Sequence, residues 1–484
     1  MKKKKSIITV ALVLCLFHVG YNSYSQVGIG TATPEESSAL DISSTSKGLL
    51  APRMTTIQRV AIDTPANGLL VYDITENAFY FYQSSAWIRM ESEVRENFKL
   101  IKSVSDLSEE LTAGGGSKYL LSTNKVYEIN GVINLAHPID LNEAYLTGVD
   151  SSDDILVKSG GTLFEGSKGG LIKNLTISAS GATVFNLSGS GNLVIKDTYI
   201  ANSNAVGSIS DFDLVYFSVV QYVNNTDGIS FSDIGNLLLS NTAWQSSNSG
   251  TYETFSGLFN LIQKQGGFME VDGSAVGIDV SANPTPAKAV LTGANFAGSS
   301  IQYINKYTSG TFPNYNFTNV WTVNCPGIPV ESDEASTGNI YYNGSITAGF
   351  VQSITSNSPV NLSGSSNTNT TTAVNLLRTS SPQNNRLTYN GKKTKTFQVN
   401  ASLSVRGNSG TGDFYAFFIR KNGNTTLVET NSLLRVNNTT DIINNAITGT
   451  VELSPNDYIE VWAQRLTGSG TTSIAVFSLN LNIK

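Results

Sequence analysis

Short apolar runs separated by turn residues recur through the middle of the chain, from Tyr119 to about Gly327. The run Ile172–Ile177 returns one period later as Ile195–Ile200, and Gly191–Ile195 returns two periods later as Gly235–Leu239. A period of about 22 residues with β-type composition predicts a right-handed parallel β-helix over residues 119–330. In such a fold each coil contributes two or three short strands, and inward side chains stack from coil to coil.

The last hundred residues follow a different pattern, in which apolar and polar positions alternate over longer runs. Such alternation, broken by turns such as Asn422-Gly423 and Pro455–Asp457, predicts antiparallel strands of a sandwich or jelly roll over residues 384–484. The predicted strands are Lys395–Val405, Asp413–Arg420, Leu427–Val436, Ala446–Leu453, Tyr458–Gln464 and Ser473–Ile483. Residues 331–383 are predicted to be the β-helix exit and a linker. The stretch from about Ser353 to Gln383 is rich in Ser, Thr and Asn, for which a linker and an exposed irregular strand are the two options.

Residues 26–90 form a small unit of their own in this interpretation. Leu69–Asp73 and Ala78–Tyr82 have the pattern of a hairpin, Gln58-Arg59 lies in a short helical candidate, and Trp87 closes the unit. So small a core cannot hide this much apolar and aromatic surface, which indicates packing against identical copies.

Residues 91–118 carry the best helical spacing in the chain, with Val94, Phe98 and Ile101 on one face and Gly114–Gly116 as a stop. The pattern predicts a connector helix beneath the next domain. A short coiled coil that sets the oligomeric state is the alternative, and the apolar repeat is too short to decide between them.

Residues 1–25 have the pattern of a cleaved signal peptide. Lys2–Lys5 precede the apolar stretch Ile7–Val19, which is too short to span a bilayer, and small residues flank Tyr24 before the predicted cut at Gln26. Leu14 before Cys15 argues against a lipoprotein. The sequence therefore predicts export to the cell surface or the extracellular space, without a membrane span.

Charge and residue counts exclude several kinds of chemistry. Without the four lysines of the leader, the chain has 27 basic and 37 acidic residues, a net charge of −10 that gives no footprint for nucleic acid. His137 and Cys325 are the only histidine and cysteine left. A zinc site of Cys and His ligands and an intramolecular disulfide are therefore excluded, and we expect no metal and no cofactor.

Three segments resemble known families. The first segment contains Gly28–Thr31, Ala39–Ile42, Lys47–Met54, Gln58-Arg59 and Gly68–Tyr72. It resembles a head module of secreted, fibre-like proteins from one group of Gram-negative bacteria. The repeat region resembles the pectate-lyase-like β-helices of viral tailspikes and tail fibres. These resemblances imply a surface or fibre-type protein.

The third resemblance is to the complement-globular and tumour-necrosis-factor-like jelly roll. It rests on Tyr415–Gly423, on Gly449–Leu453 followed by Tyr458–Trp462, and on the ending Ile474–Leu479. That family forms tight homotrimers which bind partners at their outer surfaces. The resemblance therefore implies a homotrimer.

Two sets of residues are candidates for a site. Asp211 and Asp213 would share a face if they lie on a strand, and Asp233 follows Asp211 after one coil. Paired carboxylates are what a β-helix polysaccharide lyase or glycoside hydrolase would use. Aspartate at a coil corner is also an ordinary turn residue. Outward rings at Tyr222 and Trp244 would stack on a glycan, whereas inward rings would belong to the core.

Taken together, the sequence predicts an all-β chain with a head, a parallel β-helix and a C-terminal jelly roll. The function it favours is an exported, non-enzymatic, trimeric surface or structural protein that adheres to a glycan or protein. A secreted β-helix lyase or hydrolase that uses Asp211, Asp213 and Asp233 is the alternative.

Overall fold

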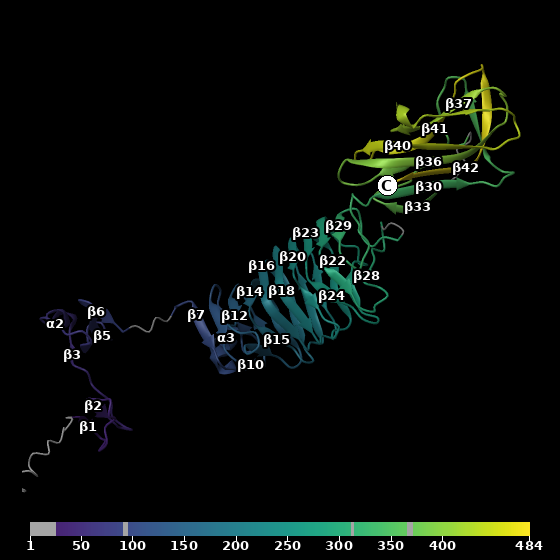
Figure 1. The fold of residues 1–484 in the computed structure, drawn as a ribbon. Coiled ribbons are helices and arrows are strands. Elements are labelled where there is room, and N and C mark those ends of the chain that lie inside the picture. The colour runs from purple at the N-terminus through teal and green to yellow at the C-terminus, as the bar shows by residue number, and fades with distance from the viewer. Residues whose placement is uncertain (1–25, 91–94, 311–313, 365–370) are drawn as a thin grey trace, which may run out of the picture. The chain divides into compact units, whose positions relative to one another are not determined.

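The computed structural model describes residues 26–90, 95–310, 314–364 and 371–484, and the predicted signal peptide lies outside them. The chain divides into two units, Met1–Arg95 and Glu96–Lys484. Strands dominate both, and helices make up a few short turns (Figure 1). None of the helices in the described segments is long and apolar enough to cross a membrane.

The first unit contains a parallel pair, β1 (Val27–Ile29) with β2 (Leu40–Ile42), and a four-stranded sheet. That sheet has the order β3–β4–β5–β6, with the helix α2 after its first strand. The bounds are β3 (Arg53–Met54), α2 (Thr56–Val60), β4 (Leu70–Asp73), β5 (Ala78–Gln83) and β6 (Ala86–Arg89). The predicted hairpin is confirmed as β4 and β5, which pair antiparallel.

Buried polar contacts and exposed apolar side chains coexist in this unit. The Arg59 Nε lies 2.9 Å from the Asp73 carboxylate, and its guanidinium lies 3.7 Å from the centre of the Tyr80 ring. Leu50 and Ile57 are 73% and 79% exposed. The expected surplus of apolar surface is therefore present on the isolated chain.

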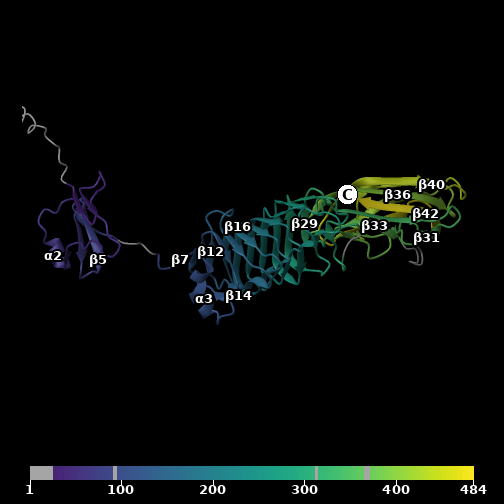
Figure 2. The same ribbon diagram turned by 90° about the horizontal axis from the view of Figure 1, so that it is seen from below.

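The second unit begins with a parallel β-solenoid of about 11 turns (Figures 1 and 2). Its strands form three faces. Face A contains β7 (Phe98–Ile101), β9 (Val126–Ile129), β12 (Tyr145–Thr147), parts of β14 (Thr162–Lys173), β16 (Thr183–Ala201) and β18 (Leu214–Val223), then β20 (Asn236–Ser240), β23 (Leu258–Gln265), β26 (Thr285–Thr292) and β29 (Trp321–Asn324).

The other two faces complete each coil. Face B contains parts of β16 and β18 with β10 (Val132–Asn134), β13 (Ile155–Val157), β15 (Thr176–Ser178), β21 (Ala243–Trp244), β24 (Phe268–Glu270) and β27 (Asn295–Ala297). Face C contains parts of β14 and β16 with β8 (Tyr119–Leu120), β11 (Ile139–Asp140), β17 (Ala205–Ser210), β19 (Ile229–Ser232), β22 (Thr251–Ser256), β25 (Val276–Asp279) and β28 (Ile304–Asn305).

The register of the coils confirms the predicted repeat. Ile172 pairs with Ile195, and Leu193 pairs with Val215, which pairs with Leu237 one coil further on. These side chains point inward and form one continuous apolar core with the aromatic stack of Phe164, Phe185 and Phe217. Each coil satisfies the backbone hydrogen bonds of the next, so the fold extends without a break.

The predicted connector helix is wrong over its central part. Phe98–Ile101 is strand β7, which pairs with β9 and completes the first coil; a short 3₁₀ turn (Val104–Leu107) and the helix α3 (Ser108–Ala113) follow. Residues 91–94 lie outside the described residues. The apolar spacing fits a helix or a strand equally well over so few residues, and pairing with the exposed edge of β9 decides for the strand.

The chain ends in two antiparallel sheets, which confirms the predicted jelly roll. One has the order β33–β30–β42–β36–β40 with β31 on β42; the other has the order β34–β35–β41–β37–β38 with β32 on β41 and β39 on β37. The bounds of the strands that the sequence predicted, in chain order, are β36 (Lys395–Gly407), β37 (Phe414–Lys421), β39 (Ser432–Arg435), β40 (Ile443–Leu453), β41 (Tyr458–Arg465) and β42 (Thr471–Ile483).

The predicted linker over residues 331–383 is wrong, because most of that stretch belongs to the jelly roll. Six strands missing from the prediction complete the sheets: β30 (Thr337–Asn343), β31 (Phe350–Thr355), β32 (Val360–Asn361), β33 (Thr372–Leu377), β34 (Thr379–Ser380) and β35 (Leu387–Tyr389), and β38 (Thr425–Thr426) is a short addition. Their composition resembles a linker, but Ile340, Phe350 and Ile354 are buried in the jelly-roll core. Pairing with β42 outweighs the polar composition.

Candidate functional site

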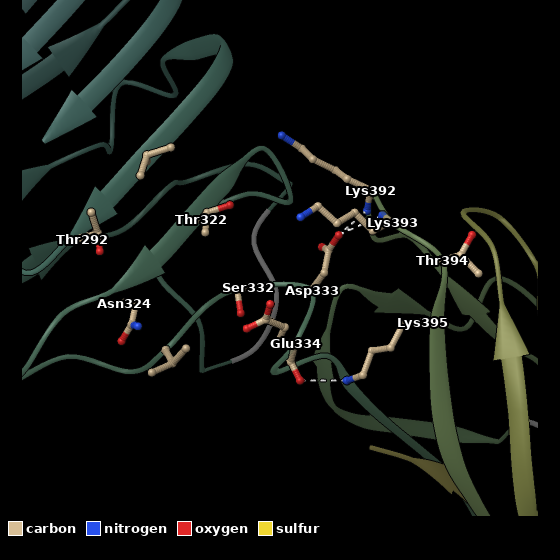
Figure 3. Close-up of a pocket in the computed structure, with 12 residues that line it drawn as sticks. Thr292, Thr322, Asn324, Ser332, Asp333, Glu334, Lys392, Lys393, Thr394 and Lys395 are labelled. Carbon is tan, nitrogen blue, oxygen red and sulfur yellow. Dashed lines mark hydrogen bonds between the residues drawn. The ribbon is translucent and has the colours of Figure 1, made fainter. Parts of the chain in front are cut away.

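A pocket of about 450 Å³ lies where the solenoid meets the jelly roll. Figure 3 shows its walls: Thr292 and Thr322 come from the solenoid strands β26 and β29, and Lys392 to Lys395 come from the segment that leads into β36. Asp333 and Glu334 lie between them. We call this the junction pocket.

A buried arginine fixes the geometry of the junction pocket. Arg378 is 1% exposed and lies between β33 and β34 of the jelly roll. Its guanidinium donates to the carbonyl oxygens of Thr318, Trp321 and Glu331 in the last solenoid coil. Charged hydrogen bonds of this kind are strong when they are dry, so they hold the jelly roll on the solenoid end.

Acidic side chains organise the backbone around this arginine. Asp333 accepts hydrogen bonds from the backbone N–H groups of Lys392 and Lys393 at 2.8 and 3.0 Å, and its other oxygen lies 3.5 Å from Arg378. The buried Glu331 accepts from the N–H groups of Asn316 and Phe317, yet burial raises the pKa of its carboxyl group.

The pocket lysines also contact the backbone. The Lys392 Nζ donates to the Val320 carbonyl and the Lys395 Nζ to the Glu334 carbonyl, each at 2.8 Å. Burial lowers the pKa of both ammonium groups, and the charge of Arg378 lowers the pKa of Lys392 further. Asp333, Lys392 and Lys395 thus contact backbone groups on the two sides of the pocket, and the arrangement serves as a joint.

The three candidate carboxylates lie on the corner between face C and face A. Asp211 and Asp213 flank the buried Phe212, so both side chains are exposed, and Asp233 occupies the same corner one coil further on. Asp211 and Asp213 lie between strands, because β17 ends at Ser210 and β18 begins at Leu214, which agrees with the interpretation as turn residues at a coil corner.

Each of these carboxylates accepts a hydrogen bond from a neighbouring coil. Asp211 accepts from the Ser188 hydroxyl, Asp213 from the Gly191 N–H, and Asp233 from the Leu258 N–H. Hydrogen bonds from Ser210 and Ser188 lower the pKa of Asp211. The carboxyl group is therefore favoured in its ionised form, whereas a general acid must be protonated. Asp211 and Asp233 also have positive φ values, which is typical of turn residues.

The candidate aromatic residues lie in the solenoid core. Trp244 and Tyr222 are 0% and 1% exposed, and the Trp244 ring stacks on Tyr252 with centroids 4.6 Å apart. The prediction of outward rings that stack on a glycan is therefore wrong for both. The inward interpretation holds because they occupy the same register column as Ile177 and Ile200, which are also buried.

The sequence interpretation missed a buried ion pair beside these rings. The Lys264 Nζ lies 2.8 Å from the Glu253 carboxylate and donates to the Thr242 hydroxyl, and both charged side chains are almost fully buried. Lys264 points inward from face A and Glu253 from face C, so the pair joins two faces inside the solenoid. The two residues are 11 apart in the sequence, about half a coil, and this spacing could have indicated that they meet across the solenoid.

The remaining histidine and cysteine pack against the apolar residues of the solenoid core. His137 contacts the Tyr119 ring edge-on, with centroids 5.8 Å apart, and Cys325 is buried at the end of the solenoid core. Burial raises the pKa of the Cys325 thiol. Within the described residues, no group of acidic, histidine and cysteine side chains could hold a metal ion.

Comparisons with known proteins add one family and a set of folds. Residues 28–106 match the family model of a phage tail-like trimerisation region. Solved structures similar to the chain include murine APRIL at pH 8.5, with 9% identity over 31% of this chain and 98% of that chain (TM-score 0.20). Eiger TNF from S. frugiperda follows with 10% identity, 31% and 92% coverage and a TM-score of 0.20.

Vertex protein P5 of PRD1 is similar at 12% identity, with 31% and 94% coverage and a TM-score of 0.19. None of the curated proteins matches the sequence significantly. The matched trimerisation region reaches into the first solenoid coil, since β7 lies within it. Together with the solenoid, this region fits a trimeric structural protein with a fibre-like architecture.

Proposed function

We propose that this chain is an exported, trimeric, fibre-like structural protein which adheres to a glycan or a protein at a surface. The match of residues 28–106 to a trimerisation region, continuous with the first solenoid coil, carries the proposal. The solenoid then acts as a stiff spacer: strands about 4.8 Å apart over about 11 turns give a rod of about 50 Å. The jelly roll supplies the second candidate site of self-association.

Exposed apolar side chains support assembly at both ends of the chain. Leu50 and Ile57 are exposed in the head, and Leu433 and Phe414 are exposed on one sheet of the jelly roll. Isolated apolar side chains on a surface are ordinary, but those of the head occupy a segment of about 65 residues. Contact with other copies would remove this surface from water.

The oligomeric state is the first test. Light scattering on the exported chain at micromolar concentration should give three times the mass of one copy. A clean monomer would contradict the proposal. Protease treatment of intact cells tests export separately, because a surface protein is cleaved without lysis and an internal one is not.

Adhesion requires a direct binding experiment. A labelled trimer applied to a panel of acidic and neutral glycans and to intact cells should show saturable binding. A trimer that binds neither glycans nor cells would retain the structural role and remove the adhesive one.

The alternative, a polysaccharide lyase or hydrolase, rests on Asp211, Asp213 and Asp233. Their carboxylates are engaged in hydrogen bonds between coils, which supports the structural role over catalysis. Turnover on the same glycan panel, lost in Asp211→Ala with Asp213→Ala, would favour the enzyme.

A further inference from the structure

One outward column of the solenoid is apolar over most of its length. The strands of face A place one side chain per coil in a single register, each paired with the next along the stack. In order from the first coil, the column is Phe98, Val126, Tyr145, Leu171, Val194, Tyr216, Leu238, Gln263 and Val290. The register ends at Thr322, which pairs with Val290, so Gln263 and Thr322 are the two polar positions; Tyr145 is 42% exposed.

The corresponding column on face C contains polar residues only. It is formed in the same way by strand-to-strand register, one residue per coil. Its members are Glu165, Asn186, Ser208, Ser230, Thr254, Asp279 and Asn305. Since both columns point away from the core, the requirement to fill the interior cannot explain why one is apolar.

Face B lies between these extremes. Its column in the same kind of register is, in order, Val132, Ile155, Thr176, Tyr199, Gln221, Ala243, Phe268 and Asn295. Polar residues interrupt this column at Thr176, Gln221 and Asn295, so no more than two apolar positions follow one another. Face A has seven successive apolar positions, from Phe98 to Leu238.

We infer that face A of the solenoid is the surface along which two further copies of this chain pack in the trimer. This inference rests on the proposed trimer and names the surface that forms it. The column starts at Phe98, which lies inside the matched trimerisation region, so that region and the column share the first solenoid coil. A second copy therefore fits the position better than an unrelated partner.

The size and the flanks of face A fit a contact between copies. Nine coils about 4.8 Å apart and strands of four to five residues give a face of about 40 by 15 Å. That area is of the order of the roughly 800 Å² that each partner contributes to a standard interface. The neighbouring outward column contains Thr147, Lys173, Lys196 and Ser240, which gives the apolar centre a polar rim.

The C-terminal end of face A, in the last solenoid coils, borders the junction pocket. Val290 and Thr322, neighbours in the face A register, both line that pocket. The lysines opposite them come from the jelly roll of the same chain (Figure 3). A contact that runs along face A therefore ends against the joint that holds the jelly roll.

Matched cysteine pairs test the inference. In a full-length Cys15→Ser background, Val194→Cys and Leu238→Cys place a thiol on face A, and Asn186→Cys and Ser230→Cys place one on face C of the same two coils. A short bis-maleimide should link copies covalently at the two face A positions and not at the two face C positions. A monofunctional maleimide should label face A thiols at least tenfold more slowly than face C thiols.

Light scattering on each variant separates this inference from the proposed function. A trimer whose face A thiols label as fast as those of face C, or whose face C thiols cross-link, overturns the assignment of the face and leaves the trimer intact. Monomers for all variants, with native circular dichroism, overturn both. The buried Cys325 is present in every variant, so its background is the same throughout.

Discussion

Faces A and C of the solenoid are built by the same coils, yet their outward surfaces differ. From Leu171 to Leu238 on face A every outward position of the central column is apolar, while the face C positions of the same coils are Glu165, Asn186, Ser208 and Ser230. The inward residues of both faces are apolar and fully buried, with a few exceptions. The inward pattern therefore reflects folding, and the outward difference reflects what each face contacts.

The Lys264–Glu253 pair joins the two faces from the inside, and breaking it should give the largest effect. Lys264→Met leaves the Glu253 carboxylate buried without its cation, which typically costs about 3–5 kcal/mol. Denaturant unfolding should show this loss. Lys264→Met combined with Glu253→Gln should recover much of it; equal losses in the single and double variants would show that the pair is not coupled.

Charge placed on the outer faces should separate them next. Tyr216→Asp would bury a carboxylate in the proposed contact, whereas Ser208→Asp lies on face C of the same coil and stays in water. Loss of an aromatic interface residue costs about 2 kcal/mol or more, so the dissociation constant of the trimer should rise by more than about tenfold for Tyr216→Asp alone. Sedimentation at decreasing concentration measures this, and equal behaviour of both variants would remove the distinction between the faces.

The buried pair also predicts a pH dependence that surface carboxylates lack. Burial raises the pKa of Glu253, although Lys264 opposes the shift. A carboxyl group whose pKa is higher in the folded chain keeps its proton there while the unfolded chain has lost it, so its contribution to stability falls as pH rises above its ordinary value of 4.5. Glu253→Gln should flatten that part of the stability curve, and an unchanged slope would contradict the shift.

The sequence predicted the fold well where the pattern of apolar positions repeats from coil to coil, and less well where a strand occurs only once. The register of Ile172 with Ile195 and of Leu193 with Leu237, two coils apart, followed from the period alone, because stacked coils impose it on every turn. The jelly-roll strand β30 and the first solenoid strand β7 were missed. Each is defined by its pairing with a segment that comes later in the chain, which the local pattern does not show.

The candidate site was harder to predict than the fold. Whether Trp244 points inward depends on a shift of one residue in register, which a two-residue strand leaves open in the sequence. In β23 every second residue from Ile262 points inward, so Lys264 falls on an inward position. A lysine among apolar inward residues could therefore have been noticed in the sequence. The outward column of face A needed the structure, because successive members lie a whole coil apart in the sequence and the coils differ in length.

The smallest expected effect concerns the corner between faces C and A, where Asp211 accepts hydrogen bonds from Ser188 and Ser210. Asp211→Asn keeps the shape and one acceptor, and the site is exposed, so stability should change by about 1 kcal/mol or less. Asp213→Asn is the matched control on the other side of the buried Phe212. A structural corner predicts small changes in unfolding for both variants and unchanged binding to any glycan that the wild-type chain retains. If either substitution abolishes turnover of a glycan without changing the unfolding curve, the corner is catalytic. Face A would then be the assembly surface, and the corner beside it would be the edge of an active site.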